Sequence, residues 1–360
     1  MLRKLVMAGV AVGALAIGGA AQAQVVGGVD KAATGYSFEE ATMEAAGTKD
    51  FHSNDGKLTF AIVTHTAGNG FFDPTYTGAL LAAKLFGVNL LMLGSEAPVD
   101  DIPRELEIIN QIMQDPTLDG LIITTPQVGA YDDIVKAAFG KGIPVATTNS
   151  FDPTILNRNQ ISHTGQDASA AAIGGEAMAQ CVLASGKKGS ILFPSTTTLG
   201  NVEVNNRVTA AFEAAIKVLN ASGKLGDYTV DAGPENIGVD VDANNIVNSV
   251  VSLMESRGDV VGIMGNNGFV TPAIVDAVAQ LDVGDQVCSF GFDLGPKQLD
   301  GIRNGNLDGS LGQQPFLQGF WPVAQLYLQI DRGVTAADLD TKAQLITKAN
   351  VDQVGKRFEN

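Results

Sequence analysis

Residues 120–148 of the chain read GLIITTPQVGAYDDIVKAAFGKGIPVATT and contain a complete strand–helix–strand unit. Apolar and β-branched runs at Gly120–Thr124 and Pro144–Thr148 predict two buried strands. Between them, Tyr131–Phe139 has apolar residues at helical spacing. Two strands joined through a helix run parallel, because the helix carries the chain back along a face of the sheet. The unit therefore predicts an α/β fold.

The same alternation continues on both sides of this unit. Further strands are predicted at Leu58–Thr64, Asn89–Leu93, Ser190–Phe193, Asp227–Val230, Val260–Met264 and Val287–Phe292. Further helices are predicted at Thr75–Phe86, Arg104–Met113, Ala168–Ala184, Glu203–Leu219, Asn244–Glu255 and Pro272–Leu281. Such alternation is typical of parallel sheets covered on both faces. Two smaller sheets suit 360 residues better than one large sheet, and we expect a crossing between lobes at Asp152–Gln166, where the alternation breaks.

The N-terminus has the pattern of a secretory signal peptide. Arg3 and Lys4 precede the uncharged run Leu5–Ala21, and Ala21-Gln22-Ala23 fits the rule for signal cleavage. A transmembrane anchor is the alternative, but 17 residues rich in Gly and Ala are short for a span. We therefore predict a signal peptide at 1–23 and a periplasmic mature chain. Residues 24–56 form an N-terminal extension in this interpretation, with one short helix near Phe38–Ala46.

Charge and composition exclude several classes of protein. The 39 acidic and 23 basic side chains give a formal net charge of -16, which argues against nucleic acid as a partner, because phosphate binding needs a basic surface. The three histidines, His52, His65 and His163, lack the spacing of a zinc site. Two cysteines are too few for a four-thiolate or iron–sulfur centre. We predict no metal and no cofactor.

Cys181 and Cys288 have two possible states. Export permits a disulfide between them. Two free, buried thiols are nevertheless the simpler prediction from sequence alone.

Polar and aromatic residues follow most of the predicted strands. Ligands of open parallel sheets bind at the carboxyl ends of the strands, so these residues decide what can be bound. The strand ends carry His65–Asp73, Thr147–Asp152, Ser195–Thr198, Gly265–Asn267, Gly291–Asp293 and Gly312–Gln314. Amides and carboxylates bond hydroxyl groups, and aromatic rings cover C–H patches. This composition favours a neutral, polyhydroxylated ligand over a phosphate, which would need a glycine-rich turn into a helix.

Motifs for catalysis are missing. No G-x-G-x-x-G follows a strand and opens a helix, and no G-x-S-x-G occurs. His65 is equally consistent with a pocket residue and with a structural hydrogen bonder, whereas His163 is predicted to be structural. The acidic groups Asp100-Asp101 and Glu105/Glu107 are interpreted as a solvated helix start. We predict no catalytic residue.

An ordered set of motifs resembles the periplasmic sugar-binding proteins of the ribose/galactose type. The set covers most of residues 57–335 and consists of Leu58–Thr64 followed by Asn69–Phe72, Asp119–Ile123, Gly142–Thr147, Asp167 with Gly174 and Gly175, Arg207, Asn266, Gly291–Asp293 and Gly309–Gln313. The resemblance implies the type I periplasmic binding protein fold, in which two Rossmann-like lobes with parallel sheets are joined by a three-crossover hinge. The lobes would comprise residues 57–163 plus 314–342 and residues 164–313 plus 343–360. The resemblance also implies a monomer that passes a sugar to an ABC permease and, in some members, to a chemoreceptor.

The resemblance assigns ligand-binding roles to individual residues. In the first lobe, Phe71 and Phe72 would stack on the sugar, and Asn69 would bond a hydroxyl. Asn149 and Ser150 stand where ribose-type proteins usually have Asp-Arg. The second lobe and hinge would contribute Arg207, Asn266, Asp293 and Gln313, with Arg207 and Asp293 each bonding vicinal hydroxyls.

Two departures from the family pattern bear on the ligand. Asn149-Ser150 removes a charge pair, which favours another pentose, a hexose or a polyol such as an inositol over ribose. The usual second-lobe aromatic is missing from Pro234–Asp242, and Phe151, Phe269 and Phe316 are the candidate replacements. Two alternatives stay open. An exported carbohydrate-active hydrolase would need two carboxylates facing each other across the cleft, and a ligand-presenting sensor subunit would have the same pocket.

Overall fold

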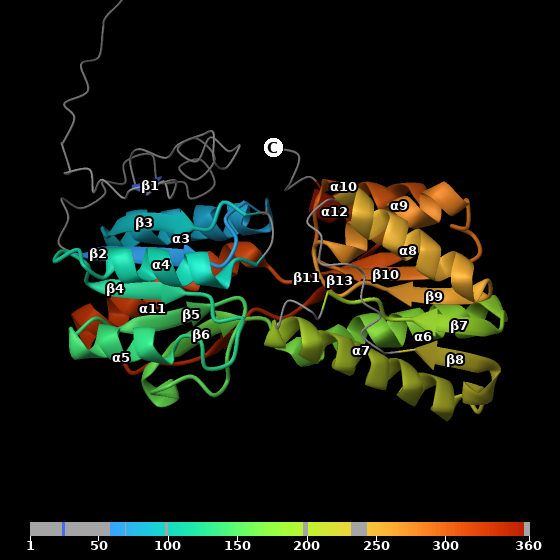
Figure 1. Cartoon of the computed structure of the whole chain (residues 1–360), viewed down its shortest axis with the longest axis horizontal. Coiled ribbons are helices and arrows are strands. Elements are labelled where there is room, and N and C mark those ends of the chain that lie inside the picture. The colour runs from blue at the N-terminus through green and yellow to red at the C-terminus, as the bar shows by residue number, and fades with distance from the viewer. Residues whose placement is uncertain are drawn as a thin grey trace, which may run out of the picture.

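The computed structural model describes residues 24–25, 58–68, 70–97, 100–196, 201–231 and 243–355. The predicted signal peptide at 1–23 and the short helix near Phe38–Ala46 lie outside these residues. The described chain forms two lobes side by side, each built on its own sheet (Figure 1). None of the helices in these ranges combines the length and the apolar character that a bilayer span requires.

The first lobe contains a 7-stranded sheet in the order β1-β3-β2-β4-β5-β6-β12. The strands are β1 (Gln24–Val25), β2 (Thr59–Thr64), β3 (Asn89–Gly94), β4 (Gly120–Ile123), β5 (Val145–Thr148), β6 (Ser162–Gly165) and β12 (Leu339–Asp340). All neighbours pair in parallel except β1, which is antiparallel to β3. The helices of this lobe are α3 (Asp73–Phe86), α4 (Ile102–Ile112), α5 (Asp132–Gly140) and α11 (Pro315–Arg332).

The second lobe contains a 6-stranded sheet in the order β13-β11-β10-β9-β7-β8. The strands are β7 (Gly189–Leu192), β8 (Tyr228–Asp231), β9 (Val260–Met264), β10 (Cys288–Phe292), β11 (Gly309–Gly312) and β13 (Gln344–Thr347), and only β13 is antiparallel to its neighbour. Its helices are α6 (Ala172–Ser185), α7 (Val202–Ala221), α8 (Ala243–Arg257), α9 (Val270–Leu281), α10 (Pro296–Asn304) and α12 (Val351–Gly355). Short 3-10 turns occur at Gly70–Phe72, Arg158–Gln160, Ala168–Ala171 and Leu225–Asp227.

Helices cover both faces of each sheet. Successive strand residues point to opposite faces, so side chains on both sides of the sheet are buried. In β2, Ala61 and Val63 pack with α4 and α5, whereas Phe60 and Ile62 pack with α3 and α11. The second sheet is covered in the same way, by α6 and α7 on one face and by α8, α9 and α10 on the other. This double burial explains why the strands are continuously apolar in the sequence.

The chain passes between the sheets three times. It leaves β6 for α6 and β7, leaves β11 for α11 at Gln313 and Gln314, and leaves β12 for β13 after Asp340. Helix α11 therefore packs against α3 in the first lobe although it lies near the end of the chain (Figure 1). The predicted fold of two Rossmann-like lobes with parallel sheets is confirmed. The residue boundaries predicted for the lobes stay a prediction.

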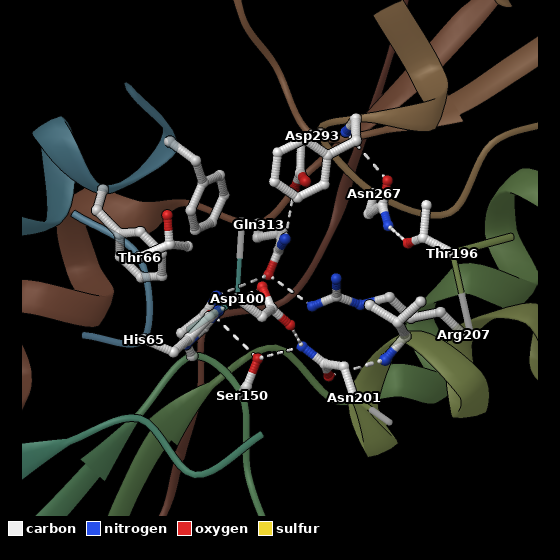
Figure 2. Close-up of a pocket in the computed structure, with 16 residues that line it drawn as sticks. His65, Thr66, Asp100, Ser150, Thr196, Asn201, Arg207, Asn267, Asp293 and Gln313 are labelled. Carbon is white, nitrogen blue, oxygen red and sulfur yellow. Dashed lines mark hydrogen bonds and ion pairs between the residues drawn. The ribbon is translucent and has the colours of Figure 1, made fainter. Parts of the chain in front are cut away.

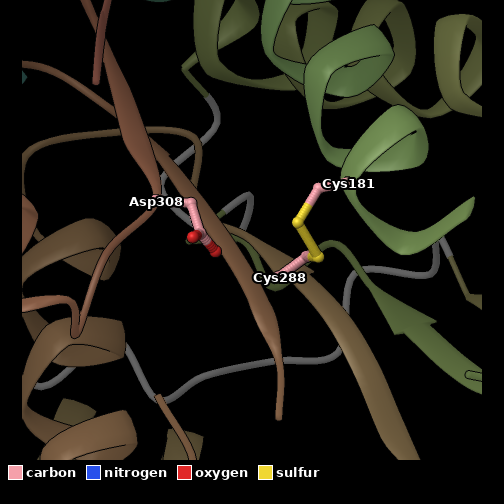
Figure 3. Close-up of side chains that lie close together, drawn as sticks. All are labelled: Cys181, Cys288 and Asp308. Atoms are coloured by element: carbon pink, nitrogen blue, oxygen red, sulfur yellow. A yellow bond between two sulfur atoms is a disulfide. The ribbon is translucent and has the colours of Figure 1, made fainter. Parts of the chain in front are cut away.

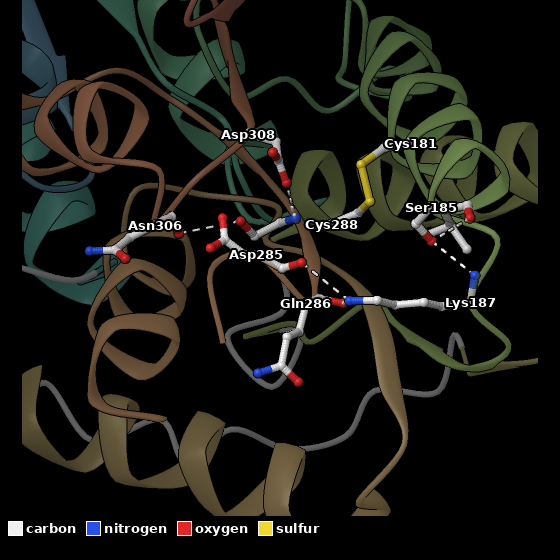
Figure 4. The surroundings of a disulfide bond; sticks show 10 residues. Cys181, Ser185, Lys187, Asp285, Gln286, Cys288, Asn306 and Asp308 are labelled. Carbon is white, nitrogen blue, oxygen red and sulfur yellow. Dashed lines mark hydrogen bonds between the residues drawn. A yellow bond between two sulfur atoms is a disulfide. The ribbon is translucent and has the colours of Figure 1, made fainter. Parts of the chain in front are cut away.

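Cys181 of α6 and Cys288 of β10 form a disulfide across 107 residues of chain (Figure 4). The prediction of free thiols was wrong, because the fold brings their Cα atoms to 6.0 Å, within the usual disulfide range. Lys187 Nζ donates to the carbonyl oxygens of Asp285 and Gln286 nearby, which also holds the end of α6 to the segment before β10.

Candidate ligand-binding site

A cavity of about 50 Å³ lies between the two lobes, at the carboxyl ends of their strands. First-lobe loops and second-lobe segments both line it, and their polar side chains point toward one another (Figure 2). The lining residues are His65, Thr66, Phe71, Phe72, Asp100, Asn149, Ser150, Thr196, Asn201, Val204, Arg207, Asn267, Gly268, Phe269, Asp293 and Gln313.

Most residues that the sequence assigned to a ligand site come together in this cavity. These are Phe71, Phe72, Asn149, Ser150, Arg207, Asp293 and Gln313. Asn266 instead lines a smaller adjacent cavity, which shares Arg207 with the first. Asn69 lies outside the described residues.

Arg207 is buried, with 4% of its surface exposed, although it lies on a helix. Its guanidinium lies 4.4 Å above the ring of Phe292, and Nη2 donates to Gln313 Oε1 at 2.9 Å. Its Nε lies 3.5 Å from Glu203 Oε1. Burial raises the pKa of Glu203 to about 7, although the charge of Arg207 opposes that shift. These contacts hold the arginine in one orientation before any ligand binds.

Gln313 joins three segments at the hinge. Its Nε2 donates to Asp293 Oδ1, and its Oε1 accepts from Arg207 and, at 3.5 Å, from Asn149 Nδ2. Asn149 also donates to Gln318 Oε1 at 3.0 Å, and Ser150 Oγ donates to Asn149 Oδ1 at 3.2 Å. Burial raises the pKa of Asp293, and the nearby Arg207 charge works against that shift. The side chains form one polar network that reaches both lobes.

Aromatic rings enter the cavity from both lobes. Phe71 and Phe72 meet edge to face at 5.0 Å between ring centroids, and Phe72 is almost fully buried in the first-lobe core. Phe269 lines the cavity from the second lobe. The other candidate replacements pack elsewhere, because Phe151 stacks on His163 and Phe316 stacks on Phe320.

The interpretation of the acidic stretch after β3 was partly wrong. Asp100 lines the cavity with its side chain only 7% exposed. Glu105 is fully buried, where it accepts hydrogen bonds from Thr124 and Tyr131, and burial raises its pKa to about 8. Asp101 does cap α4, and Glu107 is exposed, as a solvated helix start requires. Asp100 follows a predicted strand, so the strand-end argument applied to the other loops would have found it.

His65 is both a cavity residue and a structural hydrogen bonder. Its Nδ1 lies 2.8 Å from Thr124 Oγ1, and its Nε2 lies 3.4 Å from Asp100 Oδ1. Burial lowers the pKa of His65, with Asp100 opposing and Arg207 reinforcing the shift. His163 does not line this cavity, and its Nδ1 bonds Thr147 at 3.1 Å.

Further cavity residues in the second lobe position the starts of helices. Asn201 Oδ1 accepts from the first amides of α7, and Asn267 Oδ1 accepts from those of α9. Asn267 Nδ2 donates to Thr196 Oγ1 at 2.5 Å, and Asn266 Nδ2 donates to Ser195 Oγ at 2.7 Å. Within the described residues, Asn266 Oδ1 is buried without a hydrogen-bond partner. The sequence placed Thr196 and Asn267 at strand ends but gave no sign of Asn201.

Within the described ranges, one group of side chains has metal-ligand chemistry: Cys181, Cys288 and Asp308 (Figure 3). The two sulfur atoms are bonded to each other, so they do not offer the thiolates that a metal would need. Asp308 instead accepts from the backbone amide of Ser289 at 2.8 Å.

Comparisons with known proteins find one matching family model, a similar curated protein and solved structures of the same fold. A family model described as a periplasmic binding protein domain matches residues 60–333. The xylose/arabinose-binding protein XylF of Sulfolobus acidocaldarius is 25% identical over 319 residues, which cover 84% of this chain and 74% of that protein.

Solved structures with the same fold include two carbohydrate transporter proteins. The solute binding protein from Agrobacterium radiobacter, in complex with D-arabinose, has a TM-score of 0.72 at 22% identity, covering 85% of this chain and 100% of that one. A protein from Acidothermus cellulolyticus, in complex with myo-inositol, has a TM-score of 0.66 at 23% identity, covering 84% of this chain and 98% of that one.

Proposed function

The chain belongs to the periplasmic binding protein family, and on that premise we propose that it is an exported solute-binding protein. It captures a monosaccharide or polyol between its two lobes and delivers it to an ABC permease. The observation that carries this proposal is the cavity between the lobes, because amides, hydroxyls, a buried arginine and aromatic rings line it together. Hinge closure would let the ligand stabilise the closed form by contacting both lobes.

The cavity chemistry suggests a role for each group. Phe71 and Phe269 offer rings from opposite lobes, suited to the C–H patches of a sugar. Arg207 and Asp293 carry opposite charges and can bond neighbouring hydroxyls in a bidentate, charge-assisted way. Asn149 and Ser150 add neutral donors and acceptors from the first lobe. Asn69 and Asn266 complete the proposed set, Asn266 through its unpartnered Oδ1.

A pentose is the first ligand to test and a cyclic polyol the second. The neutral Asn149-Ser150 pair is compatible with either. The relatives support this order, because XylF is named for xylose and arabinose, and the related solved structures hold D-arabinose and myo-inositol.

The same proposal covers localisation and partners. The charged start and apolar run of residues 1–23 direct export to the periplasm, where the monomeric mature chain docks on the permease. A chemoreceptor is a second partner of the liganded form, and a sensor role without transport would use the same cavity.

We propose that the protein is not an enzyme. Asp100 and Asp293 line the cavity from opposite lobes, as a hydrolase would need, but each is bonded to neighbouring side chains. Asp100 accepts from Asn201 at 3.0 Å, and Asp293 accepts from Gln313. A carboxylate held in this way is suited to fixed hydrogen bonding.

A thermal-shift screen of residues 24–360 tests the proposal. The panel contains arabinose, xylose, ribose, hexoses, inositols, linear polyols and small non-sugars. A ligand at ~100 times its dissociation constant adds about 2.7 kcal/mol of stability, which shifts the melting temperature visibly. The expected result is a shift with one sugar or polyol that is recovered chemically unchanged. A consumed ligand would favour the hydrolase, and no shift with any carbohydrate would overturn the proposal.

A further inference from the structure

The start of α7 contacts the first lobe directly across the cavity. Asn201 Nδ2 donates to Asp100 Oδ2 at 3.0 Å and lies 3.5 Å from Ser150 Oγ (Figure 2). Next to it, the backbone amide of Val202 donates to the carbonyl oxygen of Pro126 at 2.9 Å. Asp100, Pro126 and Ser150 lie in the loops that follow β3, β4 and β5, so one helix start meets three neighbouring loops of the other lobe.

Asn201 uses both ends of its amide in this arrangement. Its Oδ1 accepts from the amides of Glu203 at 3.1 Å and Val204 at 3.3 Å, which caps α7. Its Nδ2 is thereby directed at the other lobe, and the side chain is 4% exposed. Only a residue with an acceptor and a donor can cap the helix and also bond a carboxylate. A simple helix cap would need no donor, since aspartate, which only accepts, caps equally well.

Asp100 is held on its own side as well. Its Oδ1 lies 3.4 Å from His65 Nε2, and His65 is bonded through Nδ1 to Thr124, which follows β4. The acceptor for Asn201 is therefore anchored to the first-lobe sheet. Arg207 lies further along the helix that Asn201 caps, so the same contact sets where the arginine enters the cavity.

We propose that Asp100, Asn201 and the Pro126–Val202 backbone pair form an interlobe latch that favours the closed form before ligand binds. Asn201 is then a positioning residue, which raises affinity by increasing the population of the binding-competent form. The latch acts on the conformational equilibrium of the free protein, so it is testable even if the proposed function fails.

Variants that exchange the two latch residues give a sharp test. N201D keeps a good helix cap but places a carboxylate against Asp100, and D100N removes the acceptor. The double variant D100N/N201D restores a donor–acceptor pair with its direction reversed. N206D makes the same charge change at an exposed position of α7 and serves as the matched control.

Two measurements apply to every variant. Pulsed EPR between spin labels at the exposed positions Lys136 and Lys217 reports the interlobe distance without ligand, and calorimetry reports the dissociation constant of the sugar found by the screen. We expect N201D to lengthen the distance and weaken binding at least about tenfold, and the double variant to recover both. N206D should match the wild type.

Two outcomes would overturn the latch. The first is an unchanged distance distribution in ligand-free N201D. The second is a double variant that stays as open as N201D. Recovery of the distance without recovery of affinity would overturn the assignment of Asn201 as a positioning residue, because it would mean that Asp100 and Asn201 also contact the ligand directly. Melting temperatures of the ligand-free variants separate these results from misfolding.

Discussion

Arg207 is the residue on which the proposed ligand site most depends. Among the described cavity-lining residues, it is the arginine that faces Gln313 and Asp293, and its guanidinium packs on Phe292. The planar guanidinium can donate to two neighbouring hydroxyls at once, whereas the ammonium group of a lysine is a single point of charge. The charge itself also offsets the burial of Glu203 and Asp293.

Arg207→Lys should therefore weaken sugar binding by about 10- to 100-fold, because one charged hydrogen bond contributes roughly 1.5–3 kcal/mol. The charge is kept, so the buried carboxylates remain compensated and the ligand-free protein should still fold. Calorimetric titration measures the dissociation constant, and Arg303→Lys, which lies at the surface with Asp300, is the matched control. Affinity within twofold of the wild type would remove Arg207 from the site.

Glu105 makes stability depend on pH. Its folded pKa is about 8, whereas an unfolded glutamate titrates near ~4.3. The folded state therefore holds the extra proton between these values, so the free energy of unfolding should fall as pH rises through this window and level off above it. The buried Glu203 and the partly buried Asp73, each with a pKa raised to about 7, act in the same direction.

Glu105→Gln should flatten this pH dependence without removing it. The neutral amide keeps a hydrogen-bonding group beside Thr124 and Tyr131 but releases no proton on unfolding. Urea denaturation at several pH values between 7 and 8.5 gives the slope for both proteins. An unfolded histidine is mostly neutral in this range, and burial lowers the pKa of His65 in the folded protein. Equal slopes would show that Glu105 is ionised in the folded protein.

At the scale of elements, two helices from opposite ends of the chain cross in close contact. A Cβ on Gly78 of α3 would overlap the carbonyl oxygen of Phe316, and one on Gly319 of α11 would overlap that of Thr75. These glycines let the backbones of α3 and α11 approach closely. Helix α11 starts directly after Gln314, so this helix contact lies next to one of the segments that cross between the lobes.

Gly78→Ala should destabilise the protein by about 1–3 kcal/mol, the usual cost of overpacking. Gly140→Ala is the matched control, because a Cβ at the end of α5 meets no atom within 4 Å. That change should be neutral or stabilising by up to about 1 kcal/mol, since glycine is a poor helix former. Denaturant titrations measure both, and equal effects would contradict the close-approach argument.

At the scale of the whole molecule, the three crossings between the lobes determine how one lobe can move relative to the other. Each lobe has its own doubly covered sheet, and the described side chains that join them gather around Gln313 and the start of α7. Such a design permits closure as a rigid-body motion about the crossings. The disulfide lies within the second lobe, away from the cavity, so it constrains the unfolded chain without opposing closure.

Cys181→Ala combined with Cys288→Ala should lower the free energy of unfolding by roughly 2–5 kcal/mol. Without the cross-link, the unfolded chain gains the conformational entropy of a long loop. Sugar affinity should stay within about twofold, because neither cysteine lines the cavity. Thermal unfolding with and without reductant checks the first expectation, and the double variant should be insensitive to reductant. A melting temperature unchanged from the oxidised wild type would show that the cross-link adds no stability.

The strands were predictable from sequence wherever burial on both faces made them apolar. Strand β6 was missed because Ser162-His163-Thr164-Gly165 is polar and becomes a strand only between β5 and β12. Helix α11 was missed because Gln residues and Pro322 interrupt its apolar pattern. Both elements take their form from the partners that tertiary structure supplies.

The sequence by itself determined the α/β class, the two lobes and the kinds of side chain at the strand ends, because these follow from local periodicity and from where a parallel strand must stop. Tertiary structure alone decided which of those side chains meet. The Arg207–Gln313 and Asp100–Asn201 bonds join residues 106 and 101 positions apart, and the disulfide joins residues 107 apart. Contacts at such separation depend on how whole lobes pack and cross, and no local pattern encodes them.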